Sequence, residues 1–147
     1  MVTVIFDIDG TLANNEHRQH FLEKNPKDWD GFFEAMVKDK PVEPICNLLS
    51  ALWLSCNLVI CTGRPEKYRQ KTLTWLNQYV LRPHYRATLL MRPDGDYRPD
   101  HEVKKEMLDK LRAEGHDIWF VVDDRKSVVD MWRTNGVTCL QCAEGDF

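Results

Sequence analysis

The chain has 147 residues, of which 43% are hydrophobic and 29% are charged, and its formal net charge at pH 7 is −3. This length and composition indicate one globular domain, residues 1–147, with enough chain to bury a core. The slightly acidic balance argues against a protein that wraps duplex nucleic acid, so we expect any contact with nucleic acid to be small and local.

Membrane and export signals are not evident in the sequence. No apolar run approaches the ~20 residues of a membrane span, and the first residues lack a basic region followed by an apolar one. We therefore expect a cytoplasmic protein that does not need disulfides. Cys139 and Cys142 have the spacing of a zinc knuckle, but the sequence contains no second pair of cysteines with this spacing. We interpret all five as small core residues: Cys46, Cys56, Cys61, Cys139 and Cys142.

The first predicted strand is the apolar run 2–6, which ends at Asp7, Ile8, Asp9, Gly10 and Thr11. Alternate residues of a strand face the same side, so the two aspartates can share one pocket. Two carboxylates this close repel unless a proton or a cation lies between them, and Mg²⁺ is the simplest cation for oxygen ligands. The glycine permits a close approach of the backbone to a ligand, and the threonine adds a hydroxyl. The alternative is an acidic loop that only caps the next helix.

Helical segments are predicted next. Asn14 is placed to cap a helix that continues to about Lys24, and Asp28 is placed to cap a second segment. The apolar residues of the second segment recur at helical spacing, which favours packing over a recognition surface: Trp29, Phe32, Phe33, Met36 and Val37. Pro41 and Pro44 then mark the start of a helix with one apolar face, formed by Ile45, Leu48, Leu49, Leu52 and Trp53.

The second predicted strand, residues 57–61, also ends at polar residues, here Thr62, Gly63, Arg64 and Pro65. Proline suits the first position of a helix, so we expect a helix from Pro65 to about Tyr79. Its free backbone N–H groups would then lie beside the threonine and the arginine and form a phosphate cradle. The alternative is an ordinary strand-to-helix turn with an exposed arginine.

Residues 81–98 are rich in arginine and contain a third predicted strand, 87–91, followed by a turn at 92–96. Because scattered surface arginines are usually only solvated, they indicate substrate contact weakly. Asp100 is placed to cap the next helix, in which Lys104 lies at the edge of an apolar face formed by Val103, Met107 and Leu111.

The fourth predicted strand, 118–122, ends at Asp123, Asp124 and Arg125. Adjacent side chains at a strand end point to opposite sides, so one carboxylate can reach a metal ion while the other supports it. A helix at 128–132 that ends at Gly136, and a last strand at 137–140, complete the chain.

This alternation of strands and helices predicts an α/β fold of the Rossmann-like, doubly wound type, with about five parallel strands. The carboxyl ends of parallel strands lie at one edge of a sheet. The polar groups of three strand ends are therefore expected to meet there, with Lys104 delivered from a helix: Asp7, Asp9, Thr62, Arg64, Asp123 and Asp124.

Four motifs follow one another along the chain: Asp7-x-Asp9-Gly10-Thr11, Thr62, Lys104 and the pair Asp123 and Asp124. In this order they resemble the motifs of the haloacid dehalogenase (HAD) phosphatase superfamily. The resemblance implies that Asp7 is a nucleophile that becomes an aspartyl-phosphate and that Asp9 is the general acid and base. It also implies that Thr62 holds the phosphoryl group and that Lys104 neutralises charge. Mg²⁺ would be bound by Asp7, the Asp9 backbone carbonyl, and Asp123 or Asp124. Only about 50 residues separate Asp9 from Thr62, so we expect a minimal cap and an open site.

A narrower resemblance is to the 3′-phosphatase domain of phage polynucleotide kinase-phosphatase. It depends on residues 123–125 and 128–133, on Gly136, Val137, Cys139 and Gln141, and on residues 145–147. The resemblance implies that Arg18, Arg64 and Asp100 join the active site. With Thr11, Gly63 and Arg125 they make up the predicted substrate-binding set. The chain contains no Gly-x-x-x-x-Gly-Lys-Ser/Thr loop, so a kinase half is not expected.

The leading hypothesis is therefore a Mg²⁺-dependent phosphomonoesterase that removes 3′-phosphates from DNA or RNA ends. The alternative is a nucleotide phosphatase that acts on deoxynucleoside monophosphates with the same chemistry. The substrate would be a 3′-phosphorylated end or a nucleotide, and a separate kinase or ligase could be a partner. If the gene is phage-encoded, the location would be the host cytoplasm. The oligomeric state and the choice between DNA and RNA stay open.

Two hypotheses come from other classes of protein. A signalling receiver domain also combines acidic residues, Thr, Lys and Mg²⁺, but its phosphorylated aspartate is expected on a middle strand, and the second and third strands here end without one. A non-catalytic module that binds nucleic-acid ends would not need both Asp7 and Asp9. Both features favour an enzyme.

Overall fold

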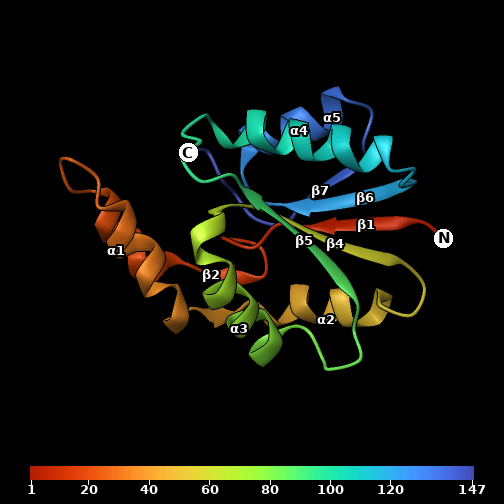
Figure 1. The fold of residues 1–147 in the computed structure, drawn as a ribbon, viewed down its shortest axis with the longest axis horizontal. Coiled ribbons are helices and arrows are strands. Elements are labelled where there is room, and N and C mark those ends of the chain that lie inside the picture. Colours follow the sequence, from red (N-terminus) through yellow and green to blue (C-terminus); the bar gives the residue numbers. More distant parts are fainter.

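The computed structural model describes all 147 residues and contains one parallel five-stranded sheet (Figure 1). The strand order is β5-β4-β1-β6-β7, and every neighbouring pair is parallel. The α/β prediction is therefore confirmed. The strands are β1 (Thr3–Phe6), β4 (Asn57–Pro65), β5 (Ala87–Arg92), β6 (Ile118–Asp123) and β7 (Cys139–Gln141).

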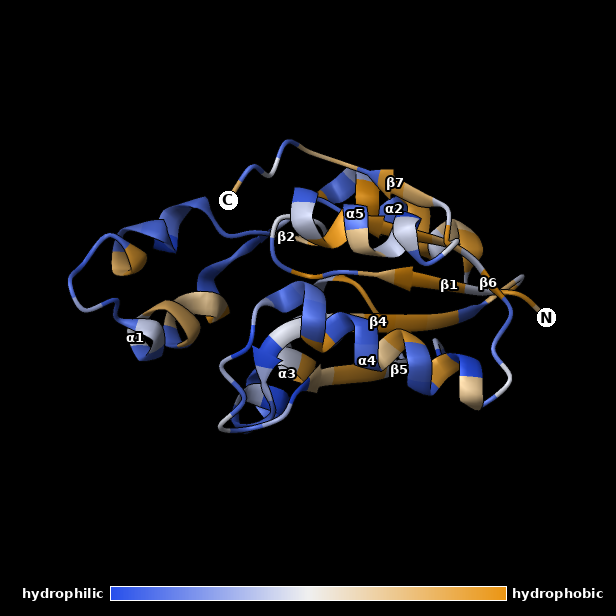
Figure 2. Cartoon of the chain, turned by 90° about the horizontal axis from the view of Figure 1, so that it is seen from above, coloured by the Kyte–Doolittle hydropathy of each residue, from blue (hydrophilic) through white to orange (hydrophobic).

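Helices cover both faces of the sheet, as Figure 1 shows. On one face lie α2 (Glu43–Leu52) and α3 (Arg69–Tyr79), and on the other lie α4 (Asp100–Ala113) and α5 (Lys126–Thr134). Side chains of β1 alternate between the two cores: Val4 and Phe6 pack on the α2 side, and Ile5 packs on the α4 side. A strand buried on both faces needs a continuous apolar sequence, which the hydropathy colouring of Figure 2 shows for β1 and β4.

A small lobe, residues 13–41, is inserted between β1 and α2 and projects beyond the sheet (Figures 1 and 2). Its base is a two-stranded antiparallel ribbon of β2 (Ala13–Asn14) and β3 (Lys40–Pro41). The lobe also contains the 3₁₀ helices η1 (Glu16–Leu22) and η2 (Ala35–Lys38) and the short helix α1 (Trp29–Glu34). This lobe is the minimal cap that the sequence predicts.

The lobe differs from the prediction in detail. In place of an α-helix up to Lys24 it has the 3₁₀ helix η1. The predicted cap at Asn14 is wrong: the N-cap residue is Asn15, because the Asn14 side chain accepts from the Glu16 backbone N–H in a tight turn before the helix (3.0 Å). The predicted cap at Asp28 is confirmed, since its carboxylate accepts from the Gly31 N–H at 2.9 Å. Of the aromatic residues, Phe32 and Phe33 are buried as predicted, whereas Trp29 is half exposed.

Two predicted helix starts are wrong. Strand β4 continues through Pro65, which pairs with Arg92 of β5, and the chain then passes through η3 (Glu66–Tyr68) before α3 begins. The predicted phosphate cradle at Pro65 is therefore replaced by extended backbone. Asp100 does not cap α4, because it is the first helical residue and its carboxylate accepts from arginine side chains instead.

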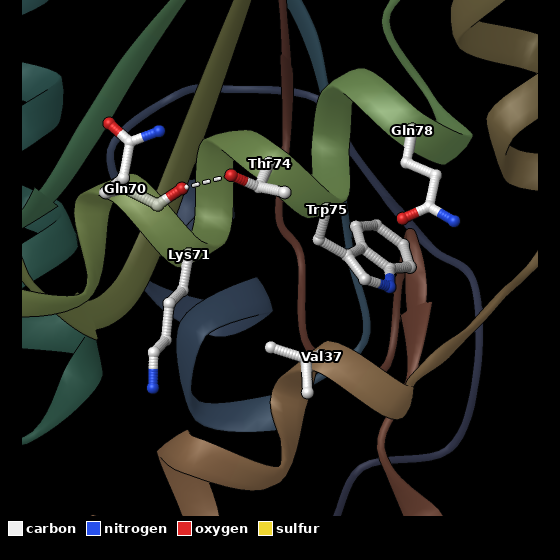
Figure 3. A pocket seen from close by; sticks show the side chains of 6 residues that line it. All are labelled: Val37, Gln70, Lys71, Thr74, Trp75 and Gln78. Atoms are coloured by element: carbon white, nitrogen blue, oxygen red, sulfur yellow. Dashed lines mark hydrogen bonds between the residues drawn. The ribbon is translucent and has the colours of Figure 1, made fainter.

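The lobe also contacts the flank of α3. The indole nitrogen of Trp75 donates to the Asp39 backbone carbonyl at 2.9 Å. Beside it lies a small hollow of about 130 Å³, into which Val37 of η2 points (Figure 3). The hollow contains none of the predicted site residues; it is lined by Val37, Gln70, Lys71, Thr74, Trp75 and Gln78.

The cysteines agree with their interpretation as core residues. All five are free thiols, and four of them are buried. None of the helices combines the length and the apolar character that a membrane span requires.

Candidate active site

The ends of β1 and β6 bring three carboxylates together. Asp7 follows β1, Asp123 is the last residue of β6, and Asp124 follows it. All three are buried, and one oxygen from each lies within 4.8 Å of the others. With Lys104 they form what we call the carboxylate cluster. Sequence spacing suggested that only one of the two adjacent aspartates would reach a metal ion, whereas the structure places oxygens of both in the cluster.

Lys104 of α4 is the cation of this cluster, and it is 1% exposed. Its ammonium group donates to Oδ1 of Asp7 at 2.7 Å and to Oδ2 of Asp123 at 2.9 Å. Burial opposes its charge, but the carboxylates of Asp123 and Asp7 raise the pKa of Lys104 well above its ordinary value. The lysine is therefore charged and holds both carboxylates in place.

Three carboxylates around one ammonium group leave the cluster short of positive charge. Burial, and then the neighbouring Asp123, raise the pKa of Asp7 well above its ordinary value. Burial also raises the pKa of Asp124, again with Asp123 as the next cause. A donor set made only of carboxylate oxygens fits a hard divalent cation such as Mg²⁺, which would supply the missing charge.

The loop after β1 supports this cluster from the other side. The Thr11 hydroxyl lies 3.2 Å from Oδ2 of Asp7 and 3.2 Å from Oδ1 of Asp124, so it can donate to either. Gly10 has φ +82°, and a Cβ there would collide with the Asp124 carboxylate. The glycine of the first motif is therefore required both by its backbone conformation and by space.

Asp9 lies in a second group, the arginine cluster, formed by Asp9, Arg18, Asp39 and Arg64. Arg64 donates through Nε and Nη2 to both Asp9 oxygens, at 3.1 and 2.7 Å, and Arg18 donates to Oδ1 of Asp9. Asp39 accepts from Nε and Nη2 of Arg18 at 2.8 and 2.7 Å. Both arginines are fully buried, and the cluster is an ion-pair network between lobe and sheet in which only the Asp9 carboxylate is partly exposed.

The network has a consequence for Asp9. Burial alone would raise the pKa of Asp9, but the guanidinium groups of Arg64 and Arg18 hold it far below its ordinary range. In this arrangement Asp9 is an ionised acceptor, bound to groups that also suit a phosphate.

The third group lies around Gly63. Thr62 is fully buried, and its hydroxyl accepts from the Arg64 backbone N–H at 3.2 Å. A Cβ at Gly63 would collide with the Asp100 carboxylate. That carboxylate accepts from Arg92 and, at 3.1 Å, from Arg125.

All of the residues that the sequence nominates thus lie in three adjoining groups at one edge of the sheet. Sequence reasoning missed two contributors. Asp39 is in the arginine cluster, and Arg92 joins Asp100 to the Gly63 carbonyl, to which it donates at 2.8 Å. For Arg92, its place in an arginine-rich segment was a weak signal. For Asp39, no local pattern marks the residue.

Comparison with known proteins agrees with this geometry. A family model described as the polynucleotide kinase PNKP phosphatase domain matches residues 1–147. A chain of the Pnkp1/Rnl/Hen1 RNA repair complex superposes with a TM-score of 0.83 at 31% sequence identity, over 99% of this chain and 43% of that chain. This chain therefore spans less than half of the length of that neighbour.

More distant structures share the fold. The class C acid phosphatase of Bacillus anthracis, solved with tungstate, has a TM-score of 0.66 at 16% identity and covers 86% of this chain and 53% of its own. A HAD family enzyme of Bacteroides thetaiotaomicron, solved with magnesium and inorganic phosphate, has a TM-score of 0.56 at 14% identity. The match covers 100% of this chain and 96% of that enzyme. The match along the whole chain, the fold and the carboxylate cluster agree, and the chain belongs to the polynucleotide kinase phosphatase-domain family of HAD phosphatases.

Proposed function

We propose that this phosphatase removes 3′-phosphates from nucleic-acid ends in a Mg²⁺-dependent reaction. The observation that carries the proposal is the carboxylate cluster, in which a buried lysine holds Asp7 at the carboxyl end of the central strand. Support for a polynucleotide substrate comes from the family whose model matches the whole chain. The neighbour in an RNA repair complex supports the same class of substrate.

In the proposed reaction Asp7 attacks the phosphorus, a bond forms between its carboxylate oxygen and phosphorus, and the bond from phosphorus to the 3′ oxygen breaks. After its arginines turn to the phosphate, Asp9 takes up a proton from solvent and gives it to the leaving 3′ oxygen. A water molecule then attacks the phosphorus of the aspartyl-phosphate, and Asp9 takes its proton. Asp7 and inorganic phosphate are released, and Asp9 returns the proton to solvent when the arginines pair with it again. Lys104 keeps the Asp7 carboxylate in place through both steps.

Bound Mg²⁺ would neutralise charge between the nucleophile and the phosphate, held by Asp7, the Asp9 backbone carbonyl, and Asp123 or Asp124. The three buried carboxylates fit this ion because their donors are all oxygens and their charges exceed that of the lysine. The HAD enzyme solved with magnesium and phosphate is consistent with this assignment.

Asp9 can handle a proton only after its arginines find another acceptor. A substrate phosphate can accept from Arg18 and Arg64 in place of the Asp9 carboxylate, which now accepts two hydrogen bonds from Arg64 and one from Arg18. Substrate binding would thus transfer the two guanidinium groups from Asp9 to the phosphate and free Asp9 beside the leaving oxygen. Thr62, Thr11 and the group around Gly63, Asp100 and Arg125 are assigned to substrate positioning.

A partnership with a separate kinase or ligase is part of the proposal. The neighbour in the RNA repair complex is assembled with Rnl and Hen1, and more than half of that chain has no counterpart here. Activities that lie in other parts of the neighbour's assembly would have to be supplied to this phosphatase by other chains or segments.

The test compares four substrates with Mg²⁺ present: a 3′-phosphorylated oligonucleotide, the same oligonucleotide with a 5′-phosphate, and free 3′- and 5′-mononucleotides. We expect phosphate release to be fastest from the 3′-phosphorylated oligonucleotide and to be absent with Asp7→Asn. Faster release from mononucleotides would contradict the proposal and favour a nucleotide phosphatase.

A further inference from the structure

An aromatic cluster of three lobe residues and Tyr68 of η3 has one member that is exposed to solvent. Phe32, Phe33 and Tyr68 are each less than a tenth exposed, whereas Trp29 is 50% exposed. The Trp29 ring stacks on Phe33, with centroids 6.0 Å apart and planes at 22°, and meets Phe32 edge-on at 5.9 Å. The indole is therefore fixed by its neighbours on one side and open to solvent on the other.

This exposed ring is linked to the candidate active site by direct contacts. The Arg18 guanidinium carbon lies 4.3 Å from the centroid of Phe32, the ring that Trp29 meets edge-on. The same guanidinium donates to Asp9. Two side chains, Arg18 and Phe32, therefore separate Asp9 from the indole.

The charge beside Trp29 is unpaired. Two lysines near the lobe have carboxylate partners: Lys24 pairs with Asp28 at 3.6 Å, and Lys67 pairs with Asp30 at 3.2 Å. Lys27 is exposed, has no ion-pair partner, and its ammonium lies 5.7 Å from the centroid of Trp29. A rigid exposed aromatic ring next to a free cation is the chemistry by which proteins hold single-stranded nucleic acid, because bases stack on the ring and phosphates meet the cation.

We propose that Trp29 and Lys27 form a stacking site for a base and phosphate of the substrate strand, close to its 3′ end. This inference rests on the proposed function, since it assigns to the lobe the discrimination between a polymer end and a small phosphate ester. A large apolar protein partner fits less well, because the open surface is one indole bordered by a charge.

The test uses the full chain and measures KM and kcat for a 3′-phosphorylated oligonucleotide and for p-nitrophenyl phosphate. Trp29→Ala should raise KM for the oligonucleotide about tenfold, leave its kcat unchanged and leave both constants for p-nitrophenyl phosphate unchanged. Trp29→Phe should retain most of the affinity because it keeps a ring. The matched control is Trp119→Ala, which removes an indole that is 53% exposed near the amino end of β6, opposite the site.

Binding gives a second readout that does not depend on turnover. Fluorescence anisotropy of a labelled oligonucleotide with a 3′-hydroxyl end should show affinity about tenfold weaker for Trp29→Ala than for Trp119→Ala. Lys27→Gln should reduce the slope of log affinity against log salt by about 0.7, the value for one phosphate contact on a single strand.

The outcomes separate this inference from the proposed function. Equal oligonucleotide binding by Trp29→Ala and Trp119→Ala would overturn the stacking site, and so would an equal loss on both substrates, which would mean a structural role. If binding depends on Trp29 while the wild type prefers mononucleotides, the stacking site stands and the proposed function is wrong.

Discussion

The carboxylate cluster and the arginine cluster adjoin at the same edge of the sheet, but their charges are arranged differently. The carboxylate cluster has three acids and one lysine, and its members come from the ends of β1 and β6 and from α4. The arginine cluster balances two acids with two arginines, and it joins the sheet to the lobe. The carboxylate cluster needs a further cation, beyond the lysine, to balance its charge. The charges of the arginine cluster are already balanced, so its arginines have to leave Asp9 before that residue can act. Removing an acid should therefore not destabilise the protein in the carboxylate cluster, whereas it should destabilise the protein in the arginine cluster.

The largest effect is expected for Asp7→Asn. The amide is not a nucleophile for phosphorus, so phosphatase activity should fall about a thousandfold or more. The folded protein should be at least as stable as the wild type, because the substitution removes one of three mutually repelling buried carboxylates. Steady-state kinetics and thermal unfolding check the two parts.

The control for Asp7→Asn is Asp130→Asn, which removes an exposed carboxylate that pairs with Lys126 on α5. It should change neither activity nor stability measurably. An Asp7→Asn protein that keeps phosphatase activity would refute the assigned nucleophile.

The next effect concerns stability rather than activity. Asp39→Ala removes the buried carboxylate that accepts from Arg18 and leaves that arginine with less compensating charge. Breaking a buried ion pair from one side costs about 3 kcal/mol of unfolding free energy. Chemical denaturation should show this loss, and it should exceed the loss in Asp30→Ala, because the ion pair of Asp30 with Lys67 is exposed to solvent. Equal losses would contradict the view of the arginine cluster as the tie between lobe and sheet.

The difference between the clusters also predicts how each responds to divalent cations. Mg²⁺ at about a hundred times its Kd should stabilise the wild type by about 2.7 kcal/mol, seen as a rise in Tm, and EDTA should reverse it. In Asp124→Asn the same rise should need more Mg²⁺, because one oxygen ligand is weakened. In Asp39→Ala the Mg²⁺ response should be unchanged. A Mg²⁺ response lost equally in both variants would mean that the clusters are not independent.

The same two clusters show how far the sequence predicts the site. The carboxylate cluster could be predicted because each acid directly follows an apolar strand, and parallel strands bring their carboxyl ends to one edge. Asp39 could not be predicted, since it reaches Arg18 only after the lobe folds back, and no periodicity marks a contact of that kind. The lobe's two-residue strands β2 and β3 are too short to leave a pattern.

Strand β4 shows the limit for boundaries. A proline suits the first turn of a helix and also the end of a strand, so Pro65 alone cannot decide between them. In the structure Pro65 belongs to the strand because β4 pairs with β5 there, with Pro65 opposite Arg92. That arginine also donates to the Gly63 carbonyl, which keeps the backbone extended. The prediction of a helix start failed because the deciding contacts come from a distant segment.

The smallest effect is expected for the helix cap in the lobe. Asp28→Ala removes the side chain that accepts from the Gly31 N–H and caps α1, a loss of about 1 kcal/mol. Because α1 carries Trp29 and Phe32 but none of the carboxylate cluster, hydrolysis of p-nitrophenyl phosphate should be unchanged, while KM for a 3′-phosphorylated oligonucleotide should rise slightly. Asp28→Asn, which keeps a side-chain acceptor, is the control and should behave as the wild type. An equal loss on both substrates would show instead that the lobe and the carboxylate cluster act as one unit.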